Sequence, residues 1–203
     1  MTRLVVIRNG NTSAPGEAPR RIGRRTDLPL VESGRKQALT LAQHFKERDI
    51  LPAALLSSPL KRAEETAGML AAELGIDLAR VIIDDRLSEL DYGPDEGCFE
   101  EEVIARIGSE ALEAWDQEAR VPPDWVIEPE TIRQDWRTLS QELDQTYAEK
   151  TVFLITSNGT ARFALALAEA SYDGPIKLRT GAYGMIEGTH NAWRVVTWNV
   201  RPD

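Results

Sequence analysis

The sequence predicts an α/β protein, a three-layer sandwich with a mostly parallel central sheet, helices on both faces and a helical excursion over the ligand end of the sheet. Short apolar runs rich in β-branched residues alternate with longer amphipathic stretches, which is typical of a parallel sheet covered by helices. The chain has 203 residues and is 42% hydrophobic, enough for one sizeable core. We therefore expect a single domain over residues 1–203, with the excursion at about 95–149.

Five short segments rich in aliphatic side chains are expected to form strands: 4–8, 53–57, 81–83, 151–156 and 193–198. Two of them stop at an Asn-Gly pair, Asn9-Gly10 and Asn158-Gly159. Asn-Gly often marks a hairpin, but apolar residues at helical spacing follow Gly159, so we expect a turn from strand to helix there. Open α/β sheets bind ligands at the carboxyl ends of their strands, and these turns are the first candidates for a site.

Helices are expected between the strands. Ser33 is a candidate N-cap for a helix that continues through Phe45 at helical spacing. A second helix is expected over 60–74, with Gly75 as its stop. Two further helical segments are acidic and are joined through a proline-containing loop at 121–124; they are 99–118 and 130–149.

Composition excludes several classes of protein. The net charge of -9 opposes binding to nucleic acid or to anionic membranes through the general electrostatic field. No run of about 18 apolar residues is present, and the N-terminus lacks the apolar region of a signal peptide, which favours a cytoplasmic protein. Cys98 is the single cysteine, so no internal disulfide is expected. We expect no metal and no cofactor.

Five motifs follow one another along the chain. They are Arg8-Asn9-Gly10-Asn11-Thr12, Thr26-Asp27-Leu28-Pro29-Leu30 with Glu32-Ser33-Gly34-Arg35, Ser57-Ser58-Pro59-Leu60-Lys61-Arg62-Ala63 with Glu65-Thr66-Ala67, Leu87-Ser88-Glu89-Leu90-Asp91-Tyr92-Gly93, and Ser157-Asn158-Gly159. In this order they resemble the signatures of the histidine phosphatase superfamily, which includes the cofactor-dependent phosphoglycerate mutases. The first resembles Arg-His-Gly-x-Thr, and the last stands where Ser-His-Gly is expected.

The resemblance implies a phosphoryl-transfer site with two asparagines at its histidine positions. In the family one histidine attacks the phosphoryl group, and a second histidine and two arginines hold the phosphate. Asn9 and Asn158 occupy these histidine positions by the resemblance. An amide has no free nitrogen lone pair, whereas a neutral imidazole has one. The chain has two histidines, His44 and His190, and neither lies in a signature motif, so surface or packing roles are expected for both.

The same resemblance implies that the other residues of the family's phosphate pocket are present. Arg8 and Arg62 match the family's arginines, and a guanidinium binds two phosphate oxygens in parallel while staying charged. Asn11 and Thr12 are expected to add neutral donors. Glu89 matches the family's acid, although general-acid work needs a carboxyl that keeps its proton near neutral pH.

A local cluster of arginines adds a further candidate feature. Arg20, Arg21, Arg24 and Arg25 lie close together in an acidic chain. They form either a solvated surface or a rim that attracts anionic ligands.

Several functions are compatible with these residues. The favoured one is a pseudoenzyme that lacks the phosphohistidine nucleophile and binds phosphate or a small phosphorylated metabolite. A second is a slow or histidine-independent phosphatase, in which Glu89 activates water. A third is an interaction scaffold that uses the acidic excursion. The Asn residues are also compatible with deliberate His-to-Asn changes in an active enzyme. A homo-oligomer is compatible with all of these.

Overall fold

The computed structural model describes residues 1–168, 172–190 and 192–203 and shows one six-stranded sheet in the order β3-β2-β4-β1-β5-β6. The strands are β1 (Thr2–Arg8), β2 (Ala54–Ser57), β3 (Val81–Ile83), β4 (Thr151–Thr156), β5 (Tyr183–Thr189) and β6 (Ala192–Val200). Strands β3, β2, β4 and β1 are parallel, and β5 and β6 add an antiparallel edge. The predicted α/β class with a mostly parallel sheet is confirmed.

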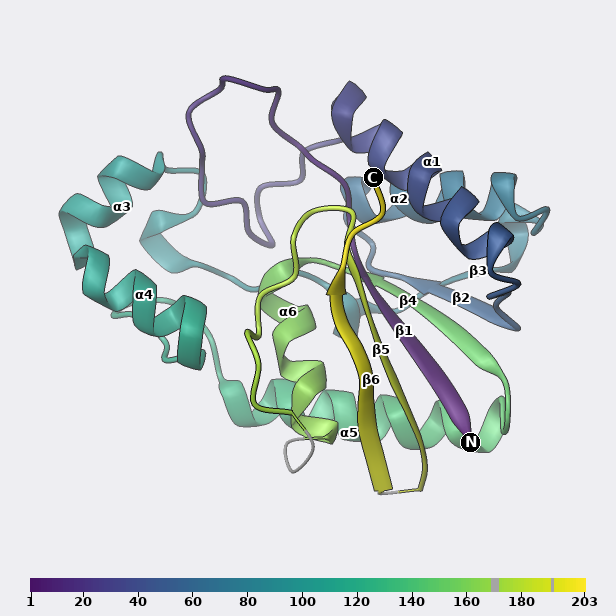
Figure 1. The fold of residues 1–203 in the computed structure, drawn as a ribbon. Coiled ribbons are helices and arrows are strands. Elements are labelled where there is room, and N and C mark those ends of the chain that lie inside the picture. Colours follow the sequence, from purple (N-terminus) through teal and green to yellow (C-terminus); the bar gives the residue numbers. More distant parts are fainter. Residues whose placement is uncertain (169–171, 191) are drawn as a thin grey trace.

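Helices cover both faces of this sheet (Figure 1). The α-helices are α1 (Glu32–Glu47), α2 (Lys61–Glu73), α3 (Glu100–Ile107), α4 (Ser109–Glu118), α5 (Pro129–Thr146) and α6 (Asn158–Ala161). The 3-10 helices are η1 (Leu78–Arg80), η2 (Asp85–Leu87), η3 (Gly93–Asp95) and η4 (Arg162–Leu167). Helices α1 and α2 lie on one face, and α5 with η4 lies on the other.

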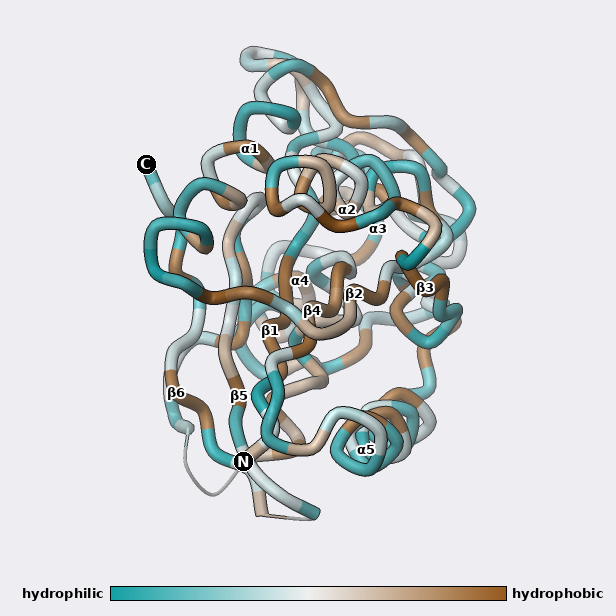
Figure 2. The backbone as a smooth tube through the Cα atoms, turned by 90° about the vertical axis from the view of Figure 1, so that its right-hand side faces the viewer, coloured by the Kyte–Doolittle hydropathy of each residue, from teal (hydrophilic) through white to brown (hydrophobic). Residues whose placement is uncertain are grey.

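Strand β1 shows why both faces are covered. Val5 and Ile7 belong to the apolar core under α1 and α2, whereas Leu4 and Val6 belong to the core under α5. A strand buried on both faces needs a continuous apolar run instead of an alternating one, and this is the pattern in the sequence. Figure 2 shows the hydrophobic central strands between α2 and α5.

Strand β5 was not predicted, because glycines interrupt its apolar residues. A Cβ at Gly184 would overlap the ring of Trp198 on β6, and one at Gly188 would overlap the carbonyl of Ala192. These glycines therefore allow the last two strands to approach closely, although glycine lowers the strand signal in the sequence.

The prediction that Ser33 caps the first helix is wrong. The N-cap of α1 is Val31, with no side-chain hydrogen bond to the helix, and Ser33 already lies inside the helix. Its hydroxyl instead accepts a hydrogen bond from Asn11 Nδ2 at 3.3 Å. The predicted stop of the second helix agrees better, because Gly75, just after α2, has a left-handed φ of 70°.

The acidic middle of the chain differs from the prediction in two ways. The segment 99–118 breaks at Gly108, whose φ is 85°, and forms the two helices α3 and α4. Helix α5 packs its apolar side against the sheet through Leu139 and Leu143 in the core that contains Leu4. The excursion is therefore shorter than 95–149, because α5 belongs to the layer that covers the sheet (Figure 1).

A small aromatic cluster holds the excursion together. The rings of Tyr92, Trp115 and Trp125 meet edge to face, with centroids 4.7–6.4 Å apart. Asp95 accepts a hydrogen bond from Trp125 Nε1 at 2.7 Å and pairs with Arg106 at 2.5 Å. Such aromatic pairs add stability beyond their buried area. The excursion is thereby fixed beside the ends of the parallel strands.

No helix in the described ranges combines the length and the apolar character needed to cross a membrane. Within these ranges, no group of three or more His, Cys, Asp or Glu side chains is arranged to hold a metal ion.

Candidate functional site

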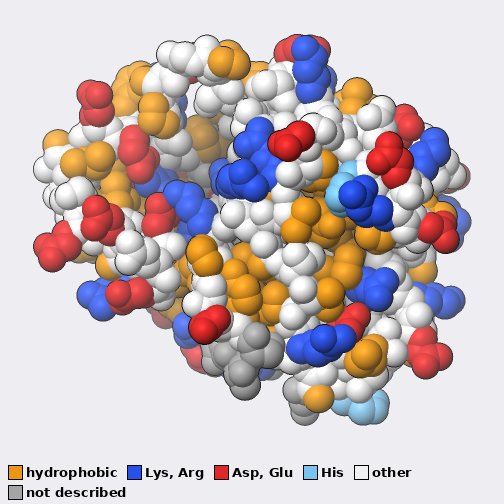
Figure 3. All heavy atoms as spheres, viewed as in Figure 1, with side chains coloured by type: hydrophobic (Ala, Val, Ile, Leu, Met, Phe, Trp, Pro, Cys, Tyr) orange, Lys and Arg blue, Asp and Glu red, His pale blue; other side chains and the backbone are white. Residues whose placement is uncertain are grey.

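A pocket of about 500 Å³ opens at the carboxyl ends of β1 and β4. All seven predicted site residues line it: Arg8, Asn9, Asn11, Thr12, Arg62, Glu89 and Asn158. Loop residues 13–22 and side chains of the excursion form its outer part. Figure 3 shows Lys and Arg side chains beside the hollow between the excursion and the body of the molecule.

The two Asn-Gly turns meet because β1 and β4 are parallel neighbours. Arg8 is opposite Thr156 in this register, so the residues that follow each strand lie side by side. Asn9 Oδ1 accepts a hydrogen bond from Ser157 Oγ at 2.8 Å, and Asn9 Nδ2 donates to its neighbour's carbonyl, Gly10 O, at 2.9 Å. Asn158 Oδ1 accepts from the backbone N–H of Leu178 at 2.9 Å. Both amides are thus ordered by protein hydrogen bonds.

Arg62 reaches the pocket from the first turn of α2 and is only 2% exposed. Its guanidinium donates to Ser157 Oγ at 3.2 Å and to the carbonyls of Thr26 and Gly23 at 3.1 Å each. Burial lowers the pKa of Arg62 from its usual value, and the nearby Glu89 opposes this shift. Arg62 therefore builds the pocket wall by fixing the loop at 23–26, in addition to bringing a positive charge.

Arg8 leaves the end of β1 and donates from Nη1 to Leu178 O at 2.5 Å. Burial lowers its pKa to about 10, while Glu89 raises it. Arg8 consequently stays protonated at neutral pH. The positive charges of Arg162 and Arg62 also contribute to lowering the pKa of Arg8, and an anion bound beside Arg8 would offset this repulsion.

Glu89 is buried, and both of its carboxylate oxygens accept hydrogen bonds. Oε2 accepts from the N–H of Gly159 at 3.1 Å, and Oε1 accepts from the N–H groups of Thr160 and Leu90 at 3.2 and 3.0 Å. A Cβ at Gly159 would overlap Glu89 and lie 2.5 Å from the Tyr92 hydroxyl oxygen, so only glycine fits. Burial raises the pKa of Tyr92 well above its usual value, and the negative charge of Glu89 makes the second-largest contribution to this rise. In this arrangement Glu89 orders the turn after β4.

The loop after β1 is held against α1. The N–H of Asn11 donates to Gln37 Oε1 at 2.9 Å, and a Cβ at Gly34 would overlap the carbonyl of Asn11. The Gly34 of the second motif is therefore needed for close approach of the loop to the helix. Thr12 follows on the same loop and also lines the pocket.

The predicted arginine cluster divides into two parts. Arg20 and Arg21 line the pocket. Arg24 pairs with Asp85 at 2.5 Å, and Arg25 pairs with Asp91 at 3.0 Å, outside the pocket lining. Sequence proximity alone did not separate these two environments.

Sequence reasoning missed several residues around the pocket. Arg162 has a side chain that is 1% exposed; it lies over the Trp115 ring at 4.1 Å and donates to Trp115 O at 2.5 Å. Asp116 and Lys177 line the pocket and pair at 2.7 Å. These residues lie in separate segments of the chain, at 115–116, 162 and 177, and form no sequence motif. The sequence offered one signal that Arg162 lies near the site: it follows Asn158 by four residues, one helical turn.

The two histidines and the cysteine lie outside the pocket lining. His44 Nε2 makes a hydrogen bond of 3.0 Å with the Tyr183 hydroxyl group. His190 follows β5, near Asp144 and the start of β1, at the other end of the sheet. Cys98 is free and partly buried in the excursion.

This arrangement defines a class: an α/β protein with a candidate anion site, in which buried and partly buried arginines and amides converge at the ends of parallel strands. The model of the histidine phosphatase superfamily (branch 1) matches residues 4–201, and the chain belongs to this family.

Curated relatives resemble parts of the chain. A "Probable phosphoglycerate mutase GpmB" of Cronobacter sakazakii is 39% identical over 93 residues, 46% of this chain and 40% of the relative. A 2,3-bisphosphoglycerate-dependent phosphoglycerate mutase of Methylobacterium is 32% identical over 97 residues, 48% of this chain and 47% of the relative. The matched region thus spans less than half the length of each of these relatives.

Solved structures resemble nearly the whole chain. A mycobacterial glucosyl-3-phosphoglycerate phosphatase complexed with VO3 has a TM-score of 0.80 and 26% identity, with 98% of each chain covered. A phosphoserine phosphatase of Entamoeba histolytica in complex with 3-phosphoglyceric acid has a TM-score of 0.74 and 21% identity, again with 98% of each chain covered. The second likeness shows the fold alone.

Proposed function

We propose that this protein binds phosphate or a small phosphorylated metabolite and does not form phosphohistidine, which makes it a pseudoenzyme of its family. The observation that carries this proposal is the pair of amides at the strand ends, Asn9 and Asn158. Their carbonyl oxygens accept hydrogen bonds from Ser157 Oγ and Leu178 N. In the proposal they stand at the family's histidine positions. An amide there donates and accepts hydrogen bonds but cannot attack phosphorus.

In this proposal Arg8 and Arg62 bring the positive charge that holds the phosphate, and Asn11 and Thr12 add neutral donors at the same strand end. Phosphate-type ligands are named in the relatives: one similar structure holds VO3, and another holds inorganic phosphate. This supports a ligand with a phosphate group.

A histidine-independent phosphatase is less well supported. It would require Glu89 to activate water or to protonate a leaving group. Both Glu89 oxygens already accept backbone hydrogen bonds, from Leu90, Gly159 and Thr160. The carboxylate therefore has a role in ordering the turn after β4.

Anion binding is tested by thermal unfolding in inorganic phosphate. At a concentration of 100 Kd, binding to the native state adds about 2.7 kcal/mol, which raises the Tm of a protein of this size by roughly 5–10 °C. Arg8→Gln should remove most of this gain, because it removes a partly buried positive charge from the pocket. Arg3→Gln is the matched control: Arg3 lies at the other end of β1, is 42% exposed and should leave the gain unchanged. An unchanged gain in Arg8→Gln would place the anion elsewhere, and no gain in any variant would favour an interaction scaffold.

The affinity for sulfate should be constant between pH 6 and 8. Sulfate stays a dianion in this range, and the pocket lining contains no imidazole to lose a proton. The pKa of Arg8 is about 10, so the guanidinium keeps its charge until the pH approaches that value, and affinity then falls as the proton leaves. Calorimetry across this range measures the slope. A steep loss of affinity between pH 6 and 8 would contradict a pocket of arginines and amides.

A further inference from the structure

The pocket has two regions of different charge. Its inner region lies at the strand ends and contains Arg8, Arg62 and Glu89, two positive groups and one negative group, with a formal charge of +1. Its outer wall comes from the loop after β1, the excursion and the segment before β5. The charged side chains of this outer wall are Glu17, Arg20, Arg21, Glu100, Asp116 and Lys177, three positive and three negative, with a formal charge of zero.

The cations of the outer wall already have partners within the protein. Lys177 Nζ lies 2.7 Å from Asp116 Oδ2, and Arg21 Nη2 lies 2.5 Å from Glu100 Oε1. Arg20 stacks over the Phe99 ring at 3.6 Å and donates to a backbone carbonyl, Gly97 O, at 3.0 Å. A second acidic group on a ligand would have to compete with these carboxylates for Lys177 and Arg21.

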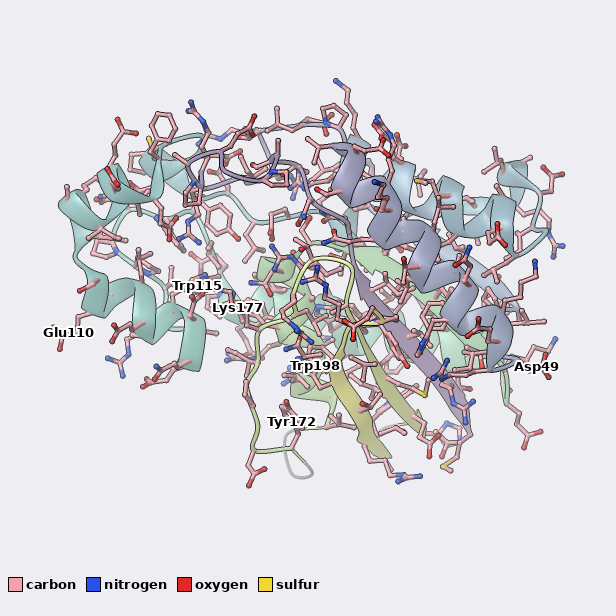
Figure 4. All side chains as sticks on the ribbon, turned by 45° about the horizontal axis from the view of Figure 1, so that its top comes forward. Asp49, Glu110, Trp115, Tyr172, Lys177 and Trp198 are labelled. Atoms are coloured by element: carbon pink, nitrogen blue, oxygen red, sulfur yellow. The ribbon has the colours of Figure 1, made fainter. Side chains whose placement is uncertain are left out.

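Asp116 is the carboxylate that a second acidic group would find hardest to displace, because it pairs with two cations. Its carboxylate lies between Lys177, at 2.7 Å, and the buried Arg162, at 3.8 Å. Figure 4 shows Lys177 beside Trp115, where α4 faces the segment that leads to β5. Asp116 thus occupies the place between two cations where the carboxylate or second phosphate of a doubly acidic ligand would otherwise bind.

The inner region offers a different environment. Among the described residues, Glu89 is the one carboxylate of this region, and it accepts hydrogen bonds from the backbone of the turn after β4. Arg8 is partly buried, and desolvation lowers its pKa, so bringing an anion next to it is favourable. The positive charge of the inner region therefore suits the binding of one phosphate group.

We infer that the ligand of this pocket is a phosphomonoester whose remaining groups are uncharged, such as a polyol phosphate, and that Asp116 and Glu100 select against a second acidic group. This inference rests on the proposed function and names its ligand class. The ion-paired outer wall presents hydrogen-bonding groups to hydroxyls, while its carboxylates repel a second anion. Asp116 and Glu100 are specificity-determining residues in this assignment.

The test compares two probes that differ in one group. Glycerol 3-phosphate carries a hydroxymethyl group where 3-phosphoglycerate carries a carboxylate. Calorimetry at low ionic strength should give an affinity for glycerol 3-phosphate that is about fivefold higher, a modest ratio because the outer wall is partly exposed and screened. Asp116→Asn should reduce this ratio to about one or invert it, because Lys177 and Arg162 then lack their counterion. Inorganic phosphate should bind the unchanged protein and the Asp116→Asn variant with equal affinity.

Glu118→Gln is the matched control. Glu118 lies on the same helix, pairs with Arg120 at 2.6 Å and is outside the pocket lining, so the ratio should not change. If Asp116→Asn does not fold, Glu100→Gln provides the same test through Arg21. Equal affinity for the two probes in the unchanged protein, or an unchanged ratio in the folded variant, would overturn the inference and leave the proposed function intact if phosphate binds. Failure of all three probes to bind would overturn both.

Discussion

The double variant Asn9→His with Asn158→His is expected to form an acid-labile phosphoprotein and to hydrolyse p-nitrophenyl phosphate roughly 10³-fold faster than the unchanged protein, by gaining a nucleophile. The geometry at Asn9 supports this gain. Asn9 Nδ2 donates to Gly10 O at 2.9 Å, and the Nδ1–H of an imidazole can make the same hydrogen bond. That bond fixes the tautomer in which Nε2 is unprotonated and nucleophilic.

Three comparisons decide this result. Mass spectrometry with acid lability should detect phosphate on the double variant and none on the unchanged protein. Asn158→His alone should remain unphosphorylated, because it restores only the partner position. Stoichiometric, acid-labile phosphate on the unchanged protein would refute the proposed pseudoenzyme. If the double variant folds and binds phosphate but is never phosphorylated, then the two asparagines are not the sole obstacle to phosphohistidine chemistry in this pocket.

The variant Arg62→Ala is expected to destabilise the protein by about 3 kcal/mol, since hydrogen bonds to a charged donor contribute about 1.5–3 kcal/mol each and the truncation leaves buried acceptors unpaired. Arg62 is 2% exposed and donates to Ser157 Oγ, Thr26 O and Gly23 O. The Tm should fall by roughly 6–12 °C. Calorimetric unfolding measures both quantities, and the stabilisation by phosphate should disappear at the same time.

Arg35→Ala provides the control for removing an arginine. Arg35 is 48% exposed and pairs with Glu65 at 3.4 Å, and a surface pair of this kind contributes less than about 1 kcal/mol. Arg62→Lys separates charge from geometry, because lysine keeps the charge but lacks the planar fork that reaches three acceptors. If Arg62→Ala is no more damaging than Arg35→Ala, then Arg62 does not build the pocket wall.

The sheet could be predicted where strands are continuous apolar runs. The segment 4–8 reads as a buried strand, and β1 forms at Thr2–Arg8 with Val5 and Leu4 on opposite faces of the sheet. Strand β5 was not predicted because Gly184 lowers the local strand signal. The structure shows why a glycine is needed there, since a Cβ at Gly184 would overlap the ring of Trp198 on the neighbouring strand. Local propensity does not predict a strand where glycine is required by close contact with a residue that is distant in sequence.

The candidate site shows the same division. Asn9 and Asn158 were singled out because each follows an apolar strand and because the resemblance places them at the family's histidine positions. The parallel pairing of β1 with β4 brings them into one pocket. The motif predicts Glu89 as a candidate acid, and that role stays a prediction; only the structure shows that its oxygens accept hydrogen bonds from the backbone of Gly159 and Thr160. A motif identifies which residue is present but not which atoms its side chain meets.

The sequence by itself determined the α/β class and the strand ends that form the pocket, because aliphatic periodicity is a local property of a chain. Arg8 and Arg62 were assigned to the pocket by the resemblance of their short motifs to those of the family. Only the tertiary structure decided where α5 packs, which arginines of the 20–25 cluster face the pocket, and that Asp116 lies between Lys177 and Arg162. Those features depend on distances between segments separated by tens of residues. Charge compensation and burial follow from such distances, and no local pattern encodes them.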